Sequence, residues 1–374
     1  MADGRAPAGV RCMLMRGGTS KGAYFLASDL PADDAARDDL LLRIMGTPDP
    51  RQIDGLGGAH PLTSKVAVVS PSADDGADVD YLFLQLGVDE AFVTDRQNCG
   101  NILAGVGPFA VERGLIAPSQ ERTSVRIRMI NTGSVATATF ATPSGIVDYD
   151  GDLAIDGVPG TAGAISLDFE GTAGSSTGAL FPTGAVADDV DGVPLGSAGP
   201  GSDRIRVTCV DNGMPTVLIR AADLGLSGDE EPEVLEGDEQ LKQRLEHIRF
   251  AAAERMGLGD VSEATVPKMV LLSAPREGGA IATRSFLPHR VHTSIGVLGA
   301  LTVAAGVLPE GSVGHELAAI PEPGHPFVIE HPTGHFDVDV AVSSAGDGRS
   351  VERSAALRTA RRIFDGTVYP RPRL

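Results

Sequence analysis

The stretch Ser64-Lys65-Val-Ala-Val-Val-Ser70 recurs in the second half of the chain as Pro267-Lys268-Met-Val-Leu-Leu-Ser273. In each copy a lysine enters a short run of aliphatic residues, which is typical of a buried β-strand. The recurrence predicts two similarly built halves.

The segments around this strand recur in the same order. Residues 10–30 and 205–224 each read as two short strands joined by a turn. Residues 33–46 and 238–257 follow as acid-rich helices, each ending in a glycine at the C-cap position. Because the order is kept while loop lengths differ, we infer an internal duplication.

An Ala/Gly-rich helix closes each half. The first, Ile102 to Arg113, is opened by the segment that contains Cys99, and the second begins near His292. Such helices are apolar on nearly all faces and must be wrapped by other elements. We therefore expect an α+β fold with two pseudo-symmetric lobes, each a curled β-sheet wrapped around a central helix. A ligand is expected where the lobes meet.

The expected lobes are residues 1–182, carrying Lys65 and Cys99, and residues 183–374. The final residues of the chain are candidates to return to the first lobe. Residues 182–203 are rich in Gly, Pro, Asp and Ser, and we expect them to form the connection.

The composition limits the partners. The 374 residues carry a formal net charge of −19, which disfavours nucleic acid and anionic membranes but permits a small anionic substrate in a local pocket. The three cysteines form no disulfide or zinc pattern. We find neither a signal peptide nor an apolar run long enough to span a bilayer, so we expect a cytoplasmic protein.

Cys99 is the strongest candidate for chemistry. It lies in Asn98-Cys99-Gly100-Asn101 at the start of a predicted helix, where unsatisfied N–H groups favour a thiolate. Asn98 and Asn101 suit the turn and the cap, and Gly100 allows a ligand to approach the backbone. A lone cysteine is more often a small buried apolar residue. The polar neighbours favour the reactive interpretation, whereas Cys12 and Cys209 are expected to be structural.

Two more features could serve an active site. Burial of Lys65 at the start of a core strand would favour a neutral amine able to act as a base, although a lysine can also extend to solvent from a strand end. The loop from Arg16 to Gly22 contains Thr19 and Ser20 and could hold a carboxylate, or be only a hairpin turn. Its spacing does not match a phosphate-binding loop. No histidine or acidic pattern predicts a metal site.

These motifs together resemble the PrpF family of isomerases, and within it the 4-oxalomesaconate tautomerase branch. The resemblance covers essentially the whole chain and rests on four motifs and the C-terminal tail: Met15-Arg-Gly-Gly-Thr-Ser-Lys-Gly22, Arg51-Gln-Ile-Asp-Gly-Leu-Gly-Gly58, Leu62-Thr-Ser-Lys-Val66, Asn98-Cys-Gly-Asn-Ile-Leu-Ala-Gly-Val-Gly-Pro-Phe109 and Arg358-Thr-Ala-Arg-Arg-Ile-Phe-Asp-Gly-Thr-Val-Tyr369.

The resemblance implies a diaminopimelate epimerase-like fold, no cofactor, and Lys65 and Cys99 as catalytic residues. Epimerases of this superfamily have a second cysteine at the other helix start, where this chain has His292, Thr293 and Ser294. A one-sided proton shift is therefore favoured over racemisation by two thiols.

We expect a 1,3-allylic proton shift in an unsaturated polycarboxylate, with 4-oxalomesaconate as the first candidate substrate. The expected substrate-binding residues are Thr19, Ser20, Asn98, Gly100, Asn101, His292 and Thr293. The same chemistry could act on 2-methylaconitate, methylitaconate or aconitate. An accessory role beside an aconitase-like hydratase and a cysteine hydrolase are the competing classes of function. A homodimer is a further candidate assembly.

Overall fold

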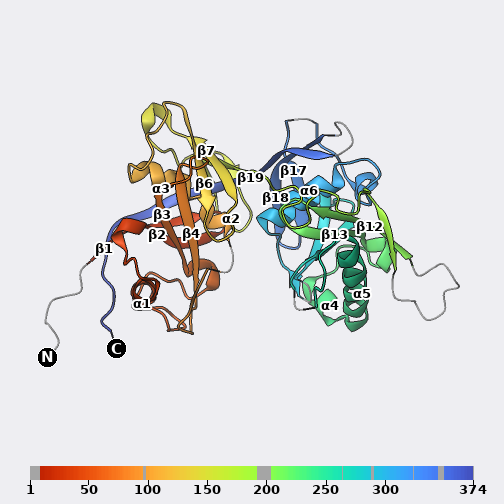
Figure 1. The fold of residues 1–374 in the computed structure, drawn as a ribbon, viewed down its shortest axis with the longest axis horizontal. Coiled ribbons are helices and arrows are strands. Elements are labelled where there is room, and N and C mark those ends of the chain that lie inside the picture. Colours follow the sequence, from red (N-terminus) through yellow and green to blue (C-terminus); the bar gives the residue numbers. More distant parts are fainter. Residues whose placement is uncertain are drawn as a thin grey trace. The chain divides into compact units, whose positions relative to one another are not determined.

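The computed structural model describes residues 9–95, 98–191, 204–262, 264–287, 290–322, 324–343 and 349–373. The chain divides into two compact units (Figure 1). The first unit contains Met1–Glu170 and Leu357–Leu374, and the second contains Gly171–Ala356. The sequence analysis placed the change of lobe after residue 182 and made the final residues candidates to return to the first lobe. In the structure the first unit ends at Glu170 and includes Leu357–Leu374.

The first unit is rich in β-structure, as the coloured ribbon shows (Figure 1). Its strands and α-helices are β1 (Val10–Gly17), β2 (Ser20–Leu26), α1 (Asp34–Met45), β3 (Lys65–Pro71), β4 (Val79–Leu86), β5 (Val93–Thr94), α2 (Gly100–Leu103), α3 (Val106–Glu112), β6 (Arg122–Met129), β7 (Val135–Ala141), β8 (Leu153–Ala154), β9 (Thr161–Ala162) and β10 (Ala164–Phe169).

The second unit has a similar order of elements. They are β11 (Asp188–Asp191), β12 (Arg204–Asp211), β13 (Pro215–Arg220), α4 (Pro232–Gly237), α5 (Glu239–Arg255), β14 (Lys268–Ser273), β15 (Ile281–Phe286), β16 (Val291–His292), α6 (Val297–Val307), β17 (Phe327–His331) and β18 (Gly334–Ser343). The long strand β19 (Ser350–Val368) contributes residues to both units.

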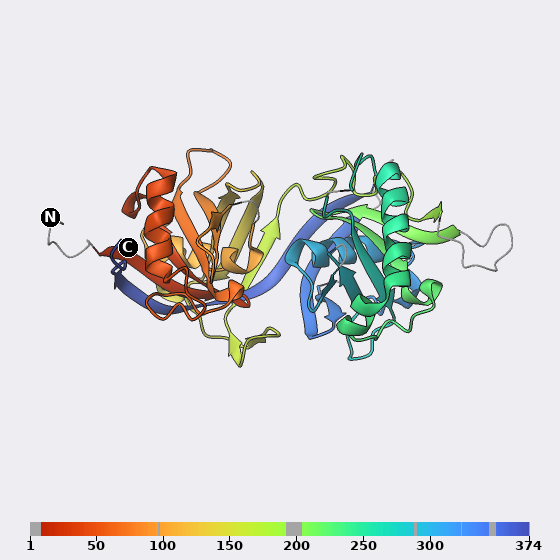
Figure 2. The same ribbon diagram turned by 90° about the horizontal axis from the view of Figure 1, so that it is seen from below.

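Capping explains where the two acid-rich helices begin. Asp33 accepts a hydrogen bond from the Ala36 N–H at the start of α1, and Asp238 does the same for Leu241 at the start of α5. Both satisfy N–H groups that have no partner inside the helix. Figure 2 shows each helix lying along one side of the strands of its own unit. The predicted helices are confirmed at these two positions.

The predicted hairpins and lysine strands are also confirmed. β1 pairs antiparallel with β2, and β12 pairs antiparallel with β13. β2 then pairs in parallel with β3, placing Gly22 beside Lys65, as β13 pairs in parallel with β14, placing Thr216 beside Lys268. In both units the lysine is therefore the first residue of a central strand.

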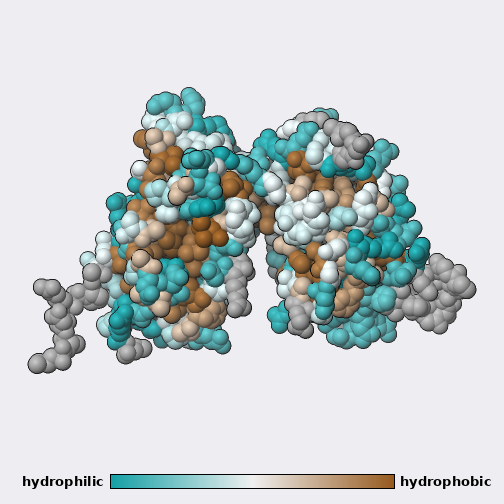
Figure 3. Space-filling model, viewed as in Figure 1, coloured by the Kyte–Doolittle hydropathy of each residue, from teal (hydrophilic) through white to brown (hydrophobic). Residues whose placement is uncertain are grey.

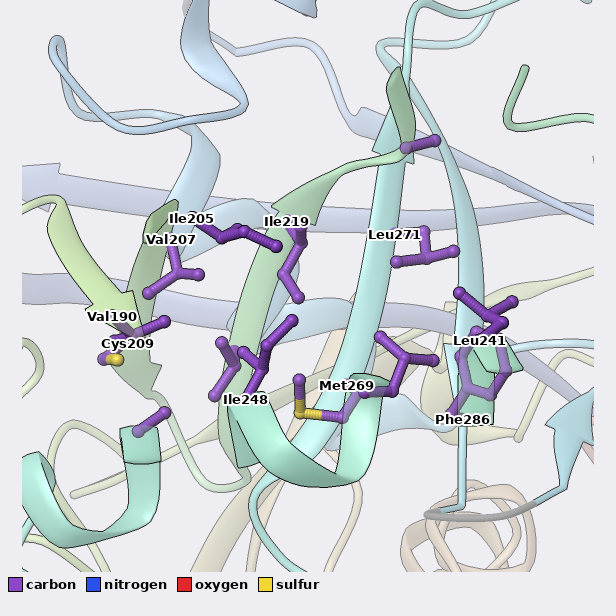
Figure 4. Packing of buried hydrophobic residues seen from close by; sticks show 14 of the residues in the cluster. Val190, Ile205, Val207, Cys209, Ile219, Leu241, Ile248, Met269, Leu271 and Phe286 are labelled. Carbon is purple, nitrogen blue, oxygen red and sulfur yellow. The ribbon is translucent and has the colours of Figure 1, made fainter. Parts of the chain in front are cut away.

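In each unit the strands bury one face against the acid-rich helix. In the second unit this face contributes Cys209, Met269 and Phe286, which pack with α5 residues such as Ile248 (Figure 4). The first unit has the equivalent cluster, with Cys12 among its members. Burial raises the pKa of both the Cys12 and Cys209 thiols to about 12, as befits the structural role that we expected for them.

The Ala/Gly-rich helices differ from expectation. The helix predicted to run on to Arg113 is divided into α2 and α3, with Pro108 in the first turn of α3, where it cannot donate a backbone hydrogen bond to Ala104. The second helix, α6, begins at Val297 rather than near His292, because the chain remains extended at its N-cap, Gly296. α6 packs against β12, β13, β17 and β18.

On the face shown in Figure 3, hydrophobic residues cover a broad area of the first unit among hydrophilic ones. Within the described residues, we find no helix that is both long and apolar enough to cross a membrane.

Candidate active site

Lys65 is buried at the start of β3, with 6% of its surface exposed. Its Nζ donates a hydrogen bond of 2.7 Å to Gln85 Oε1 and lies 5.1 Å from the centre of the Phe83 ring. Within the described residues, no carboxylate lies at salt-bridge distance from this amine. All the contacts that hold Lys65 Nζ in the described structure are therefore with uncharged groups.

Gln85 is fixed by contacts on its other side. It lies opposite Lys65 on β4, and its Nε2 group lies 3.1 Å from the carbonyl oxygens of Pro61, Ser64 and Leu86. Because only the amide nitrogen can donate to carbonyls, Oε1 must face the lysine. The surrounding backbone thus determines the orientation of the lysine's partner.

A second buried glutamine organises the loop that leads to Lys65. Gln52 accepts hydrogen bonds from the Ala59 N–H and the Ser64 hydroxyl, each at 2.8 Å, and donates to Thr47 Oγ1. It is 1% exposed and has a φ of 45°, in the left-handed region. Gly57 lies so close to this side chain that a Cβ at residue 57 would come within 2.2 Å of it.

The glycine turn between β1 and β2 packs directly on the start of α2. A Cβ at Gly17 would lie 2.4 Å from the Asn101 carbonyl oxygen, and one at Gly18, where φ is +50°, would lie 2.1 Å from Asn101 Oδ1. Asn101 Nδ2 donates to Thr19 Oγ1 at 3.0 Å. Only glycine allows this approach, so the turn and the helix start form one surface.

Gly22 links this surface to Lys65. A Cβ at Gly22 would lie 2.8 Å from the Lys65 carbonyl oxygen and 3.1 Å from Ile102 Cδ1. Tyr24, two residues along the strand, donates a hydrogen bond of 2.5 Å to the Ile102 carbonyl. Burial raises the pKa of Tyr24 well above its usual value, so it remains a neutral donor. The strand that begins with Lys65 and the helix that begins after Cys99 therefore adjoin the same strand, β2.

Cys99 is half-buried and occupies the N-cap position of α2. Its carbonyl accepts hydrogen bonds from the Leu103 N–H at 3.0 Å and the Tyr81 hydroxyl at 3.4 Å. The expected capping by the asparagines is wrong, because Asn98 Nδ2 donates to Thr132 Oγ1 and Asn101 donates to Thr19. No histidine contacts the thiol in the described part of the chain, whereas a cysteine hydrolase would need such a base.

Two polar atoms of predicted site residues lack a partner. Ser20 is 1% exposed, and neither its Oγ nor the buried Asn98 Oδ1 has a hydrogen-bond partner in the part of the chain that the structure describes. Buried polar atoms are normally satisfied, so these two are candidates to bind a ligand. By contrast, Arg16 is occupied internally, because it donates to Gly18 and to Thr359 of β19.

His292 and Thr293 lie in the second unit, at the end of β16 and just before α6. The His292 Nδ1 atom accepts a hydrogen bond from the Ser294 N–H at 2.9 Å, and the Thr293 carbonyl accepts one from Thr333 Oγ1 at 2.8 Å. Burial, followed by the charge of Lys268, lowers the pKa of His292. Among the described residues, no cluster of three or more His, Cys, Asp or Glu side chains could hold a metal ion.

Comparison with known proteins agrees with the sequence motifs. The pattern of the PrpF protein family matches residues 8–371. The chain belongs to the PrpF family. Two family relatives are the (4E)-oxalomesaconate Delta-isomerase of Novosphingobium sp. (strain KA1), 57% identical, and the 4-oxalomesaconate tautomerase of Pseudomonas putida, 54% identical. Each comparison covers 96% of this chain and respectively 96% and 95% of the relative.

Solved structures extend this comparison. A methylitaconate-delta-isomerase is 34% identical and superposes with a TM-score of 0.86 over 98% of this chain and 96% of its own. A hydroxyproline epimerase from Agrobacterium vitis, 16% identical, superposes with a TM-score of 0.51 over 96% of this chain and 92% of its own. The latter shows a shared fold only. The PrpF-family chain thus has a β-rich fold shared with isomerases and epimerases.

Sequence reasoning missed Gln85, Phe83 and Gln52. The signal for Gln85 was present, because it is a polar residue inside the apolar run of β4 and alternates with Tyr81 and Phe83 on one face. The role of Gln52 depends on loop contacts that no local pattern encodes.

Proposed function

We propose that this chain catalyses a 1,3-allylic proton shift in 4-oxalomesaconate, moving the C=C bond without a cofactor. Support comes from the two 4-oxalomesaconate isomerases that are more than half identical to it over nearly their whole length. The chain is an isomerase of the PrpF family, and the choice of substrate and the roles of individual residues are the proposal.

The observation that carries the mechanism is the uncharged environment of Lys65. Lys65 Nζ donates a hydrogen bond to Gln85 Oε1, and no described carboxylate lies at salt-bridge distance from it. In the proposed reaction Lys65 removes the proton next to the C=C bond and the carboxylate or keto group. General base catalysis of this kind contributes about 10²–10⁴-fold.

The dienolate needs stabilisation where its charge develops. The first N–H groups of α2, at Gly100 and Asn101, have no partner within the helix, and the Ser20 hydroxyl has none among the described residues. We assign substrate binding to these groups together with Thr19 and Asn98, and to His292 and Thr293 of the second unit. Lys65 or Cys99 then returns the proton at the far end of the allyl system.

The remaining expectations belong to the same proposal. They are two pseudo-symmetric lobes of the diaminopimelate epimerase type, a cytoplasmic location, a small polycarboxylate as partner and a homodimer. The local similarity of the β2–β3 and β13–β14 pairs supports the pseudo-symmetry.

Ultraviolet absorbance tests the function directly. We expect the purified chain to change the absorbance of 4-oxalomesaconate faster than that of methylitaconate, 2-methylaconitate or aconitate. Lys65→Met and Lys65→Arg should both lose activity by about 10² or more, because neither side chain can act as a base near neutral pH. Cys99→Ser should also be impaired.

Wild-type rates from folded Lys65→Met and Cys99→Ser proteins would refute the mechanism. Methylitaconate is the second candidate substrate, because the methylitaconate-delta-isomerase superposes with a TM-score of 0.86. Faster turnover of methylitaconate would replace 4-oxalomesaconate in the proposal. No turnover of any of these compounds by the isolated protein would favour the accessory role.

A further inference from the structure

The chain has only four lysines: Lys21, Lys65, Lys242 and Lys268. Lys242 forms an ion pair of 2.8 Å with Glu239 on the surface of α5. Lys268 has no carboxylate at salt-bridge distance within the described residues, although the chain contains 50 acidic residues. Lys268 is half-buried, and partial burial of a charge costs free energy unless an opposite charge or hydrogen-bond partner compensates it. A bound anion would supply that compensation.

The strand register places three polar residues of the second unit on one face. Val270 of β14 lies opposite Ser285 of β15, and Ser285 lies opposite His292 of β16. Because side chains alternate along a strand, Lys268 points to the same side as Val270. This face is opposite to the one that carries Met269 and Phe286 against α5.

In the first unit, Lys65 lies opposite Gln85 on β4. The Phe83 ring, two residues before Gln85 on the same strand, lies beside the Lys65 amine. Continuing the β14–β15 register by one residue puts Lys268 opposite Leu287, so Ser285 takes the place equivalent to Phe83. The first unit thus sets an aromatic ring beside its lysine, whereas the second unit sets a hydroxyl group there. A hydroxyl suits a bound anion better than an aromatic face does.

Ser285 and His292 supply donors for such an anion. Ser285 is 7% exposed, and its buried Oγ has no hydrogen-bond partner among the residues that the structure describes. His292 Nδ1 accepts from the Ser294 N–H, so in the neutral ring the proton is on Nε2, which can donate. Burial, and then the charge of Arg249, lowers the pKa of Lys268, while the charge of Lys268 acts on His292.

We propose that Lys268, Ser285 and His292 form a carboxylate-binding site in the second unit, taking one carboxylate group of a small polycarboxylate. Lys268 supplies the positive charge, and the hydroxyl and imidazole groups supply hydrogen bonds. That this ligand is the isomerase substrate rests on the proposed function, whereas the site itself does not.

Nuclear magnetic resonance of the full chain labelled with [ε-¹³C]lysine tests the site, because four lysines give at most four signals. The Lys268 signal is the one that Lys268→Met removes. The probe is propane-1,2,3-tricarboxylate, which is saturated and cannot undergo an allylic shift. We expect its addition to move the Lys268 signal saturably, and Ser285→Ala to weaken binding about tenfold.

Two variants serve as matched controls. Ser312→Ala removes another buried hydroxyl of the same unit, which donates to the Val307 carbonyl, and Lys242→Met removes the surface ion pair. Both should bind the probe within about twofold of the wild type. An unmoved Lys268 signal, or wild-type affinity in folded Ser285→Ala, overturns the site. Failure of the proposed function would instead appear as absent turnover with the Lys268 response intact.

Discussion

Lys65 Nζ and Gln85 Oε1 are joined by a hydrogen bond of 2.7 Å, and the other end of the Gln85 amide lies against three backbone carbonyls. The three carbonyls determine the orientation of the Gln85 amide, and the amide oxygen holds the Lys65 amine in place. Gln85 is therefore a positioning residue for the proposed base, acting on the substrate only through Lys65.

Removing this partner should reduce turnover without removing the base. Gln85→Met keeps the volume and loses the hydrogen bond, so we expect kcat to fall about 10²-fold, as misplacement of a reacting group by about 1 Å can cause. Gln85→Glu would place a carboxylate against Lys65 Nζ and should also reduce turnover. Steady-state rates between pH 6 and 10 measure both. Thr142→Val, which deletes a buried hydroxyl just after β7 in the same unit, is the control for lost stability.

The contact between the glycine turn and α2 predicts a steric effect at residue 17. In Gly17→Ala the new Cβ would meet the Asn101 carbonyl oxygen at 2.4 Å, so the turn must move away from the helix start. We expect a loss of about 2 kcal/mol in the free energy of unfolding, together with reduced kcat. Urea denaturation measures the loss in the free energy of unfolding, and steady-state assays measure kcat. Gly237→Ala, where no atom lies within 4 Å of the added Cβ, should change stability little; an equal loss in both variants would contradict a steric cause.

Thiol labelling should distinguish the three cysteines. The pKa of about 12 for Cys12 and Cys209 leaves almost no thiolate at pH 8, and both side chains are buried, whereas Cys99 is half-buried. Iodoacetamide at pH 8 should therefore modify one residue in the native protein and three after unfolding. Mass spectrometry counts the adducts. Native Cys99→Ser should take up none, and rapid modification of Cys12 would show that the core opens readily.

An ion pair between α3 and β19 should make stability depend on pH. Arg113, whose side chain is 2% exposed, donates two hydrogen bonds to Asp365, and these contacts lower the pKa of the Asp365 carboxyl. The contribution of this ion pair to the free energy of unfolding is present above the unfolded-state pKa of about 3.9. It is lost as the pH falls through the lower pKa of Asp365 in the folded protein.

We expect Asp365→Asn to cost about 1 kcal/mol at pH 7, a modest figure because the carboxylate is partly exposed, and less at pH 3. Thermal unfolding at the two pH values measures the difference. Glu170→Gln breaks the exposed pair with Arg126 and should have little effect at either pH. A cost for Asp365→Asn that grows in acid would contradict the expected direction of the pH dependence.

The two hairpins, the two acid-rich helices and the lysine-led strands were predictable because their signals are local. β-Branched runs, Asp at the N-cap and Gly after the last turn each act within a few residues. The division of the helix after Cys99 was less visible, although Pro108 and the preceding Gly105 and Gly107 explain it. The later start of α6 was not predictable, since the extended backbone at Gly296 has no strong local signature.

By itself, the sequence determined the repeated order of hairpin, acid-rich helix and lysine-led strand, the family and the choice of Lys65 and Cys99 as candidates, because these follow from residue order and motif spacing. Only the tertiary structure decided what surrounds them. That Gln85 faces Lys65, that Gln52 supports the loop before it and that Ser285 shares a face with Lys268 all depend on strand register and long-range packing. Sequence separation says nothing about such contacts, since pairing a different residue across the ladder would exchange every neighbour.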